Sequence, residues 1–276
     1  MCIRDRAGFN INFNRGKVDK LADNVTGLYG TEWATSSTFP KSDYVLKEGR
    51  PVGLVRGLTA DGFYTTDDFT YANGVYTLKE GVADVSSAVF PNYHLHNGMN
   101  ERPAGQLAYP GMAKFKDLND DGIINDDDVD VIGDMTPVHT GGFNINATYK
   151  NFDLGLYFNW SYGNEIYNVN KLAALYGYKE GAVYENKLSI VKDCYKIYDV
   201  VNGELVALTT PEQLNAANAN AKLPLAYSEN GYVSTLGIED GSYLRLNTLT
   251  LGYTLPKSML QKAGISNLRV YGSIYN

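Results

Sequence analysis

The sequence of 276 residues lacks several features that would identify a function. Its two cysteines, Cys2 and Cys194, belong to no metal or redox spacing, so a disulfide framework or a cysteine metal centre is excluded. It has 24 Lys plus Arg against 31 Asp plus Glu, and no basic cluster, which argues against nucleic acid as a partner. No nucleophile–base set or pair of carboxylates stands out, so we predict no catalytic residues and no enzyme activity.

The sequence also lacks a long apolar run. None approaches the roughly 18 residues of a membrane helix. A β-barrel strand needs only about 10 residues with one apolar face, so a membrane location stays open. Residues 1–6 are charged and contain no signal peptide, although a barrel protein requires one. Either the protein is not a barrel, or its natural start lies upstream, and we expect residues 1–6 to lie outside the first strand.

Tyrosine and glycine are abundant, with 22 Tyr and 28 Gly. Tyr has an apolar ring and a polar hydroxyl, which suits boundaries between water and an apolar phase. Residues 142–162 contain two alternating apolar/polar runs joined by a tight turn at Lys150-Asn151. Each run is long enough to cross an outer membrane, so this segment is predicted to be a membrane hairpin.

Similar patterns occur at both ends of the chain. Residues 7–14 form a short two-faced strand, and residues 242–276 contain further membrane strands. The alternation changes parity at Asn247-Thr248, which predicts a β-bulge. Residues 256–263 are predicted to form a helical turn between these strands.

Two long segments, 15–140 and 163–240, separate the strands. Asn73-Gly74 and Asn202-Gly203 predict hairpins, and Thr210 before Pro211 predicts a helix start. Residues 170–178 and 127–132 also have a helical pattern. If the short turn at residues 150–151 is periplasmic, both long segments are extracellular. The fold class is therefore an all-β, antiparallel transmembrane β-barrel with long extracellular loops containing short helices.

Residues 117–128 follow the pattern of a calcium loop, in which oxygen ligands at fixed spacing suit a hard cation and Gly122 supplies the sharp turn. Position 12 is Asp rather than Glu and no helix precedes the loop, so it is not a complete EF-hand. We predict a structural Ca²⁺ site, with an acidic solvated loop as the alternative. The predicted metal ligands are Asp117, Asn119, Asp121, the carbonyl of Ile123, Asn125 through water, and Asp128.

Three other groups of residues are candidates of lower specificity. The three histidines, His94, His96 and His139, have no further metal partner nearby and are interpreted as surface-loop residues. The acidic run 126–130 is interpreted as solvated rather than as a second cation site. The loop aromatics could stack on sugar rings or pack loops together, and both readings stay open for Trp33, Tyr64, Tyr93, Tyr176 and Tyr178.

Taken together, these motifs resemble the SusC/RagA family of TonB-linked outer-membrane transporters of Bacteroidetes, from about Phe9 to the end of the chain. The matching segments are 44–53, 115–122, 131–133, 142–143, 149–154, 161–168, 242–246, 250–256 and 267–271. The resemblance implies that residues 1–276 are a fragment of a barrel of about 22 strands, without signal peptide, plug or last strands.

The resemblance also implies a function. Such a protein sits in the outer membrane of a Gram-negative cell, in contact with its lipid, and imports oligosaccharides or peptides. Its partners would be a SusD-like lipoprotein and, through the plug, the TonB complex. One alternative is a TonB-dependent siderophore or cobalamin receptor. Another is a soluble extracellular glycan-binding protein with a dockerin-like calcium loop, in which the apolar strand faces would pack on one another.

Overall fold

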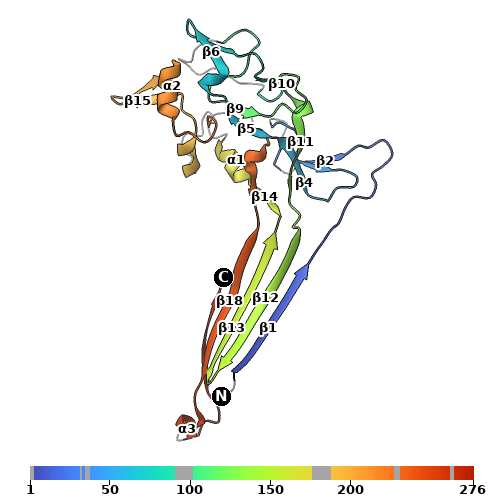
Figure 1. Ribbon diagram of the computed structural model, residues 1–276, viewed down its shortest axis with the longest axis vertical. Helices are drawn as coiled ribbons and strands as arrows, with labels where there is room; N and C mark the ends of the chain where they lie inside the picture. Colours follow the sequence, from blue (N-terminus) through green and yellow to red (C-terminus); the bar gives the residue numbers. More distant parts are fainter. Residues whose placement is uncertain are drawn as a thin grey trace. The chain divides into compact units, whose positions relative to one another are not determined.

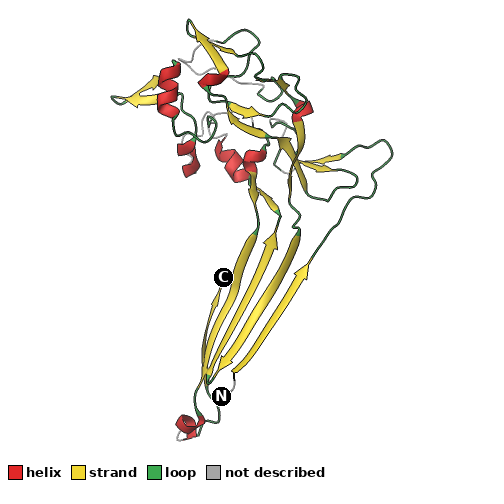
Figure 2. Ribbon diagram, viewed as in Figure 1, coloured by secondary structure: helices red, strands yellow, loops and turns green. Residues whose placement is uncertain are grey.

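The computed structural model describes residues 3–31, 33–34, 38–90, 102–175, 188–226, 231–261 and 264–276. The chain divides into two compact units. Unit 1 contains residues 1–16, 135–165 and 240–276, and unit 2 contains residues 17–134 and 166–239. Strands, most of them antiparallel, dominate the described residues (Figures 1 and 2). No helix in these ranges is long and apolar enough to cross a membrane, a finding that concerns helices alone.

Unit 1 is a single antiparallel sheet of five long strands that lie side by side (Figure 1). Their spatial order is β1-β12-β13-β18-β19, and one short helix, α3, follows β18. The bounds are β1 Ile3–Asn12, β12 His139–Tyr149, β13 Phe152–Tyr162, β18 Tyr243–Thr254, α3 Lys257–Leu260 and β19 Arg269–Tyr275.

The predicted hairpin is confirmed. β12 and β13 pair in register from His139 opposite Tyr162 to Tyr149 opposite Phe152. Lys150, in the two-residue turn, has a φ of 55°. This left-handed conformation is what a tight hairpin with right-handed strand twist requires. The short connection holds the two alternating patterns in register, so that apolar residues of both strands share one face.

The expected position of the first strand is wrong at both ends. β1 starts at Ile3 and ends at Asn12, so the charged N-terminal residues belong to it. Their backbone pairs with the last residues of β12, and Arg4 and Arg6 lie opposite Thr148 and Asn146. The arginines fall on the polar face of the sheet, whereas Asp5, opposite Ala147, falls on the apolar face. Strand pairing here outweighs the poor strand preference of charged residues.

The predicted bulge is also confirmed. Tyr157 pairs with Thr248 and the next residue, Phe158, pairs with Leu246, so Asn247 has no partner on β13. The extra residue restores the alternation that the sequence interrupts. As a result, the leucines on either side of Asn247 lie on the same face of β18.

Within the described residues, unit 2 contains a four-stranded sheet, strand pairs and short helices. The sheet has the order β11-β4-β3-β2, with bounds β2 Leu28–Gly30, β3 Tyr44–Leu46, β4 Leu54–Leu58 and β11 Val129–Asp134. The pairs are β5 Ala60–Phe63 with β9 Ala113–Phe115, β6 Phe69–Ala72 with β7 Val75–Leu78, β8 Asp84–Val85 with β10 Ile123–Ile124, β14 Glu165–Tyr167 with β17 Ile238–Asp240, and β15 Tyr198–Val201 with β16 Glu204–Ala207. The helices are η1 Thr66–Asp68, η2 Asp126–Asp128, α1 Val169–Leu175, η3 Ser189–Asp193, α2 Pro211–Asn218 and η4 Thr235–Gly237.

The local signals for turns and helices have mixed outcomes. Both Asn-Gly hairpins are present as β6–β7 and β15–β16. Thr210 caps α2 as predicted, since its hydroxyl accepts a hydrogen bond from the backbone N–H of Gln213. α1 occupies the described part of the predicted helix 170–178. Of the one or two helical turns predicted at 127–132, the chain makes one short turn, η2, at Asp126–Asp128. The remainder of that prediction is wrong, because the chain then enters β11, where Val129 pairs with Leu58 of β4.

The two long segments form one unit with a common hydrophobic core. Tyr64 and Tyr109 from the first segment are fully buried with Leu214 and Tyr232 from the second. The segments run side by side at Gly57, where the N–H of the next residue, Leu58, donates to the carbonyl oxygen of Val233 at 2.9 Å. A Cβ on Gly57 would lie 2.5 Å from that oxygen, so only glycine fits.

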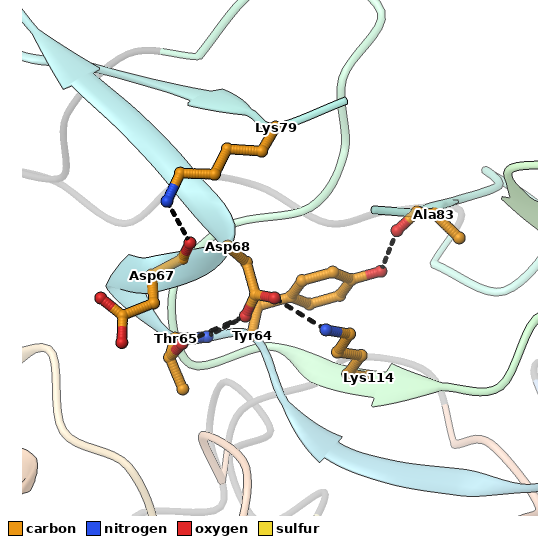
Figure 3. Close-up of polar contacts among 7 residues, drawn as sticks. All are labelled: Tyr64, Thr65, Asp67, Asp68, Lys79, Ala83 and Lys114. Atoms are coloured by element: carbon orange, nitrogen blue, oxygen red, sulfur yellow. Dashed lines mark hydrogen bonds and ion pairs between the residues drawn. The ribbon is translucent and has the colours of Figure 1, made fainter. Parts of the chain in front are cut away.

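A polar cluster fixes the start of β6 in unit 2 (Figure 3). Asp68 accepts hydrogen bonds from the backbone N–H of Thr65 at 2.7 Å and from Lys114 Nζ at 2.7 Å. The hydroxyl of Tyr64 donates to the carbonyl oxygen of Ala83. Burial raises the pKa of Asp68, but the bonds from Lys114 and Thr65 outweigh it, so the pKa lies below its usual value.

Candidate functional site

The sheet of unit 1 has two chemically different faces. Its register places the side chains of alternate residues on opposite sides. Apolar residues collect on one face and stay open to their surroundings: Ile145 is 39% exposed, Leu251 51% and Leu244 67%. An apolar surface of this extent is costly in water and suits contact with lipid. The opposite face carries the polar residues Asn144, Asn146, Thr148, Asp153, Tyr157, Thr248, Thr250, Arg269 and Ser273.

Aromatic rings bound the apolar face at both ends. Near the hairpin turn, the rings of Phe152 and Tyr253 lie 4.6 Å apart. At the other end of β13 lie Trp160 and Tyr162. The ten steps from residue 152 to residue 162 correspond to about 33 Å along a strand. At a tilt of about 40° this is a height of about 25 Å, which is the apolar band of an outer-membrane barrel.

The polar face contains a shallow recess of about 320 Å³ beside an ion pair. The guanidinium of Arg269 on β19 reaches across β18 to the carboxylate of Asp153 on β13, and its Nε donates to Oδ1 at 2.9 Å. Thr250 and Ser273 are joined by a hydrogen bond of 2.9 Å nearby. This face can present hydrogen-bonding groups to a polar ligand or to another polar part of the protein.

The calcium-type loop lies in unit 2 and folds around its own carboxylates. Asp117 accepts from the backbone N–H of Gly122 at 2.7 Å, and Asp121 accepts from the N–H of Ile123 at 2.8 Å. Asp128 is fully buried and closes the loop, because its two oxygens accept from Leu118 and Asn125. Gly122 has a φ of 83°, as a sharp turn requires.

The predicted ligands are thus brought into one loop, where their side chains also accept hydrogen bonds from the backbone of the loop. Asn119 accepts from the N–H of Asp121, and Asn125 accepts from the N–H of Asp127. Among the residues that the structure describes, no three His, Cys, Asp or Glu side chains are placed to hold a metal ion. The donor set consists of oxygen atoms alone, which fits Ca²⁺ in kind. The calcium site stays a prediction.

The weaker candidates can be placed where they are described. His139 is not a loop residue but the first residue of β12, and its Nδ1 accepts a hydrogen bond from Trp160 Nε1 at 3.1 Å. Tyr64 is fully buried and packs near Phe69, so it serves the core rather than a sugar. Cys194 is buried as a free thiol, and burial raises its pKa to about 11.

The remaining candidates differ in burial, and five of them lie outside the described residues. Trp33 is half-buried. The acidic run is exposed at Asp126, Asp127 and Asp130, in agreement with solvation, whereas Asp128 is buried. His94, His96, Tyr93, Tyr176 and Tyr178 lie outside the described residues.

Three glycines that the sequence did not single out prove to be structural requirements. A Cβ on Gly141 would lie 2.3 Å from the ring of Trp160, and one on Gly252 would lie 2.5 Å from the carboxylate of Asp153. Gly57 allows the two segments of unit 2 to approach each other closely. The sequence shows the glycines, but only the register shows which neighbour occupies the space. The signal for such a glycine in the sequence would have been an aromatic or charged residue at the paired position on the adjacent strand.

Comparison with known proteins gives a consistent result. No family model matches the chain. Two TonB-dependent receptors of Formosa agariphila are 29% and 26% identical to it, each over 97% of the chain. The chain spans 21% and 24% of their lengths. The RagAB peptide transporter matches 99% of the chain with a TM-score of 0.60 at 18% identity, and the chain spans 23% of that structure. The closed-closed state of the RagAB peptide importer gives a TM-score of 0.58.

Proposed function

This chain is part of a TonB-dependent receptor, as its motifs predicted, and we propose that it forms part of the barrel wall of a SusC/RagA-type importer. TonB-dependent receptors are outer-membrane transporters and not enzymes. The observation that carries the proposal is the five-stranded sheet with one apolar and one polar face, whose apolar face has aromatic rings at both ends. The apolar face would meet lipid and the polar face would line the lumen.

The edges of this sheet support a closed barrel. β1 and β19 each pair with one neighbour only within the described residues. In a bilayer an unpaired strand edge would leave backbone groups without hydrogen bonds. We therefore place further strands of the receptor beside both edges, in a barrel of about 22 strands.

The lengths of the connections support the orientation that we propose. Lys150 and Asn151 form a two-residue turn, whereas residues 17–134 and 166–239 form unit 2. Outer-membrane barrels have short periplasmic turns and long extracellular loops. The hairpin turn is therefore periplasmic in the proposed arrangement, and unit 2, with the calcium-type loop, is extracellular.

The proposed cargo is an oligosaccharide or a peptide. A SusD-like lipoprotein would act as the extracellular partner, and a plug domain would connect the receptor to the TonB complex. The solved RagAB structure is described as a peptide transporter, and its similarity to this chain in fold supports this class of importer. A siderophore or cobalamin receptor is the rival within the family. The open apolar face argues against a soluble glycan-binding protein, in which such faces would pack together.

Growth of the source organism tests the proposal. A strain without the complete receptor should fail to grow on one oligosaccharide or peptide mixture as sole carbon source, and the restored gene should recover growth. The receptor should be found in the outer-membrane fraction together with a SusD-like lipoprotein. Loss of iron-chelate or cobalamin uptake with unchanged growth on every glycan and peptide would favour the rival instead.

We also propose that the loop 117–128 is a structural calcium site. Asp117, Asn119, Asp121, Ile123, Asn125 and Asp128 would supply oxygen ligands, with the residue at position 9 acting through water. Bound Ca²⁺ would neutralise carboxylates that lie close together in one loop, and it would fix the turn that leads from β9 into β11.

A further inference from the structure

The apolar face of unit 1 contains a recess at the end away from the hairpin turn. Its volume is about 520 Å³, and residues of four neighbouring strands line it. Its rings form a continuous set, in which Phe9 stacks on Trp160 at 5.4 Å and Phe143 lies 6.3 Å from Trp160. Phe9 is 70% exposed and Leu244 is 67% exposed, so the recess opens on the face proposed to meet lipid.

Gly141 creates this arrangement. It lies between Ile11 of β1 and Trp160 of β13, on the strand that separates them. The Trp160 ring covers the position that a Cβ of Gly141 would take, 2.3 Å away. Because this space is free, the indole can reach across β12 and stack on Phe9. The backbone φ of Gly141 is not in the left-handed region, so the requirement is for space and not for conformation.

His139 supplies a polar group at the rim of the recess. Its Nδ1 accepts the hydrogen bond from Trp160 Nε1, so in the neutral ring the proton is on Nε2, which can donate. Tyr162 stacks on the imidazole at 5.0 Å and Phe13 meets its edge at 5.7 Å. The two ring contacts fix the imidazole plane. No described residue accepts a hydrogen bond from Nε2.

We propose that this recess holds one phosphate-bearing lipid of the surrounding membrane, an inference that rests on the proposed function. One acyl chain would lie on Phe9, Phe143 and Leu244, where the apolar face continues toward the membrane interior. A phosphate or ester oxygen would accept a hydrogen bond from Nε2 of His139. The occupant is a lipid because the recess lies at the aromatic border of the apolar band, where head groups meet acyl chains.

Native mass spectrometry of the complete receptor in mild detergent tests this inference, with phosphatidylglycerol and diacylglycerol of the same chains as probes. The unmodified receptor should retain one phosphatidylglycerol. Gly141→Ala, which displaces the indole, and Trp160→Leu, which removes it, should each lower retention about tenfold. Gly272→Ala is the matched control, because it lies on the same face with open space around it and should retain the lipid. His139→Phe should abolish the preference for phosphatidylglycerol.

Equal retention in all variants would overturn the inference, since it would mean that lipid binds the whole apolar surface alike. A lower dimer fraction in Gly141→Ala with no lipid bound would also overturn it, because a second copy would then occupy the recess. Membrane fractionation of the cells distinguishes failure of this inference from failure of the proposed function. If the receptor assembles in the outer membrane and retains no lipid, only this inference fails, whereas absence from the outer membrane would remove both.

Discussion

The guanidinium of Arg269 forms an ion pair with the carboxylate of Asp153 across an intervening strand, and Gly252 leaves the space for it. A Cβ on Gly252 would lie 2.5 Å from Asp153 Oδ1 and 2.6 Å from a terminal nitrogen of Arg269. The pair therefore joins β13 to β19 directly over β18. It fixes the relative register of three strands near the proposed periplasmic end.

The ion pair over Gly252 predicts that substitutions of Gly252 and Asp153 lower the stability of the receptor non-additively. Gly252→Ala and Asp153→Asn should each lower the unfolding temperature of the assembled receptor, because each breaks the same ion pair. The double variant should be little worse than Gly252→Ala alone, since the pair is already lost. Gly272→Ala is the control, as no atom lies within 4 Å of its Cβ position. Fully additive losses would show that the pair does not link the strands.

The bulge at Asn247 predicts that deletion of this one residue of β18 is tolerated. Deleting Asn247 should allow assembly, because Leu246 then continues the ladder next to Thr248 and keeps its place on the apolar face. Deleting Thr250 should block assembly, since Leu249 would be moved to the polar face. Heat-modifiable migration of the receptor on gels measures assembly. Loss of assembly in the Asn247 deletion would show that the bend of the bulge is itself required.

The close approach of the two long segments at Gly57 predicts that they are stable only together. Gly57→Ala would bring its Cβ to 2.5 Å from the carbonyl oxygen of Val233 and 2.9 Å from Ile132. Overpacking of this kind costs about 1–3 kcal/mol. Hydrogen exchange should therefore increase in both segments of unit 2. Gly30→Ala, with only Tyr44 at 3.8 Å, should leave exchange unchanged. A change confined to the first segment would contradict the common core.

Much of unit 1 could be predicted from the sequence, because a strand pattern and a two-residue turn are local signals. The positions of Lys150 and Asn247 alone fix a hairpin and a bulge. The joint core of unit 2 could not be predicted, since nothing near Gly57 in the sequence indicates Val233. The strand at β11 was missed for the same reason, as its partner β4 lies about 70 residues away. For the loop 117–128, spacing indicates the ligands but not whether they converge.

The lowered pKa of Asp68 predicts an acid sensitivity in unit 2. Because the pKa is below its unfolded value of about 3.9, the carboxylate contributes stability above that pH and loses it as pH falls through the folded pKa. Exchange of the amides in η1 should therefore rise below about pH 4 in the unmodified receptor. In Asp68→Asn this added rise should be absent. An identical acid response in both proteins would show that Lys114 and Thr65 do not hold this carboxyl in its charged form.

The calcium-type loop predicts a metal-dependent stability. If the loop binds Ca²⁺, a concentration 100-fold above the dissociation constant should stabilise the folded receptor by about 2.7 kcal/mol. Asp121→Asn should remove this effect, because it deletes a charged ligand and keeps the size of the side chain. Asp127→Asn is the matched control, since Asp127 is exposed and holds no ligand position in the same acidic run. Thermal unfolding with calcium, with magnesium and with a chelator gives the measurement. An unfolding temperature that is the same in all three conditions would contradict the calcium site. The backbone N–H groups that donate to Asp117 and Asp128 would then be sufficient to stabilise the acidic loop.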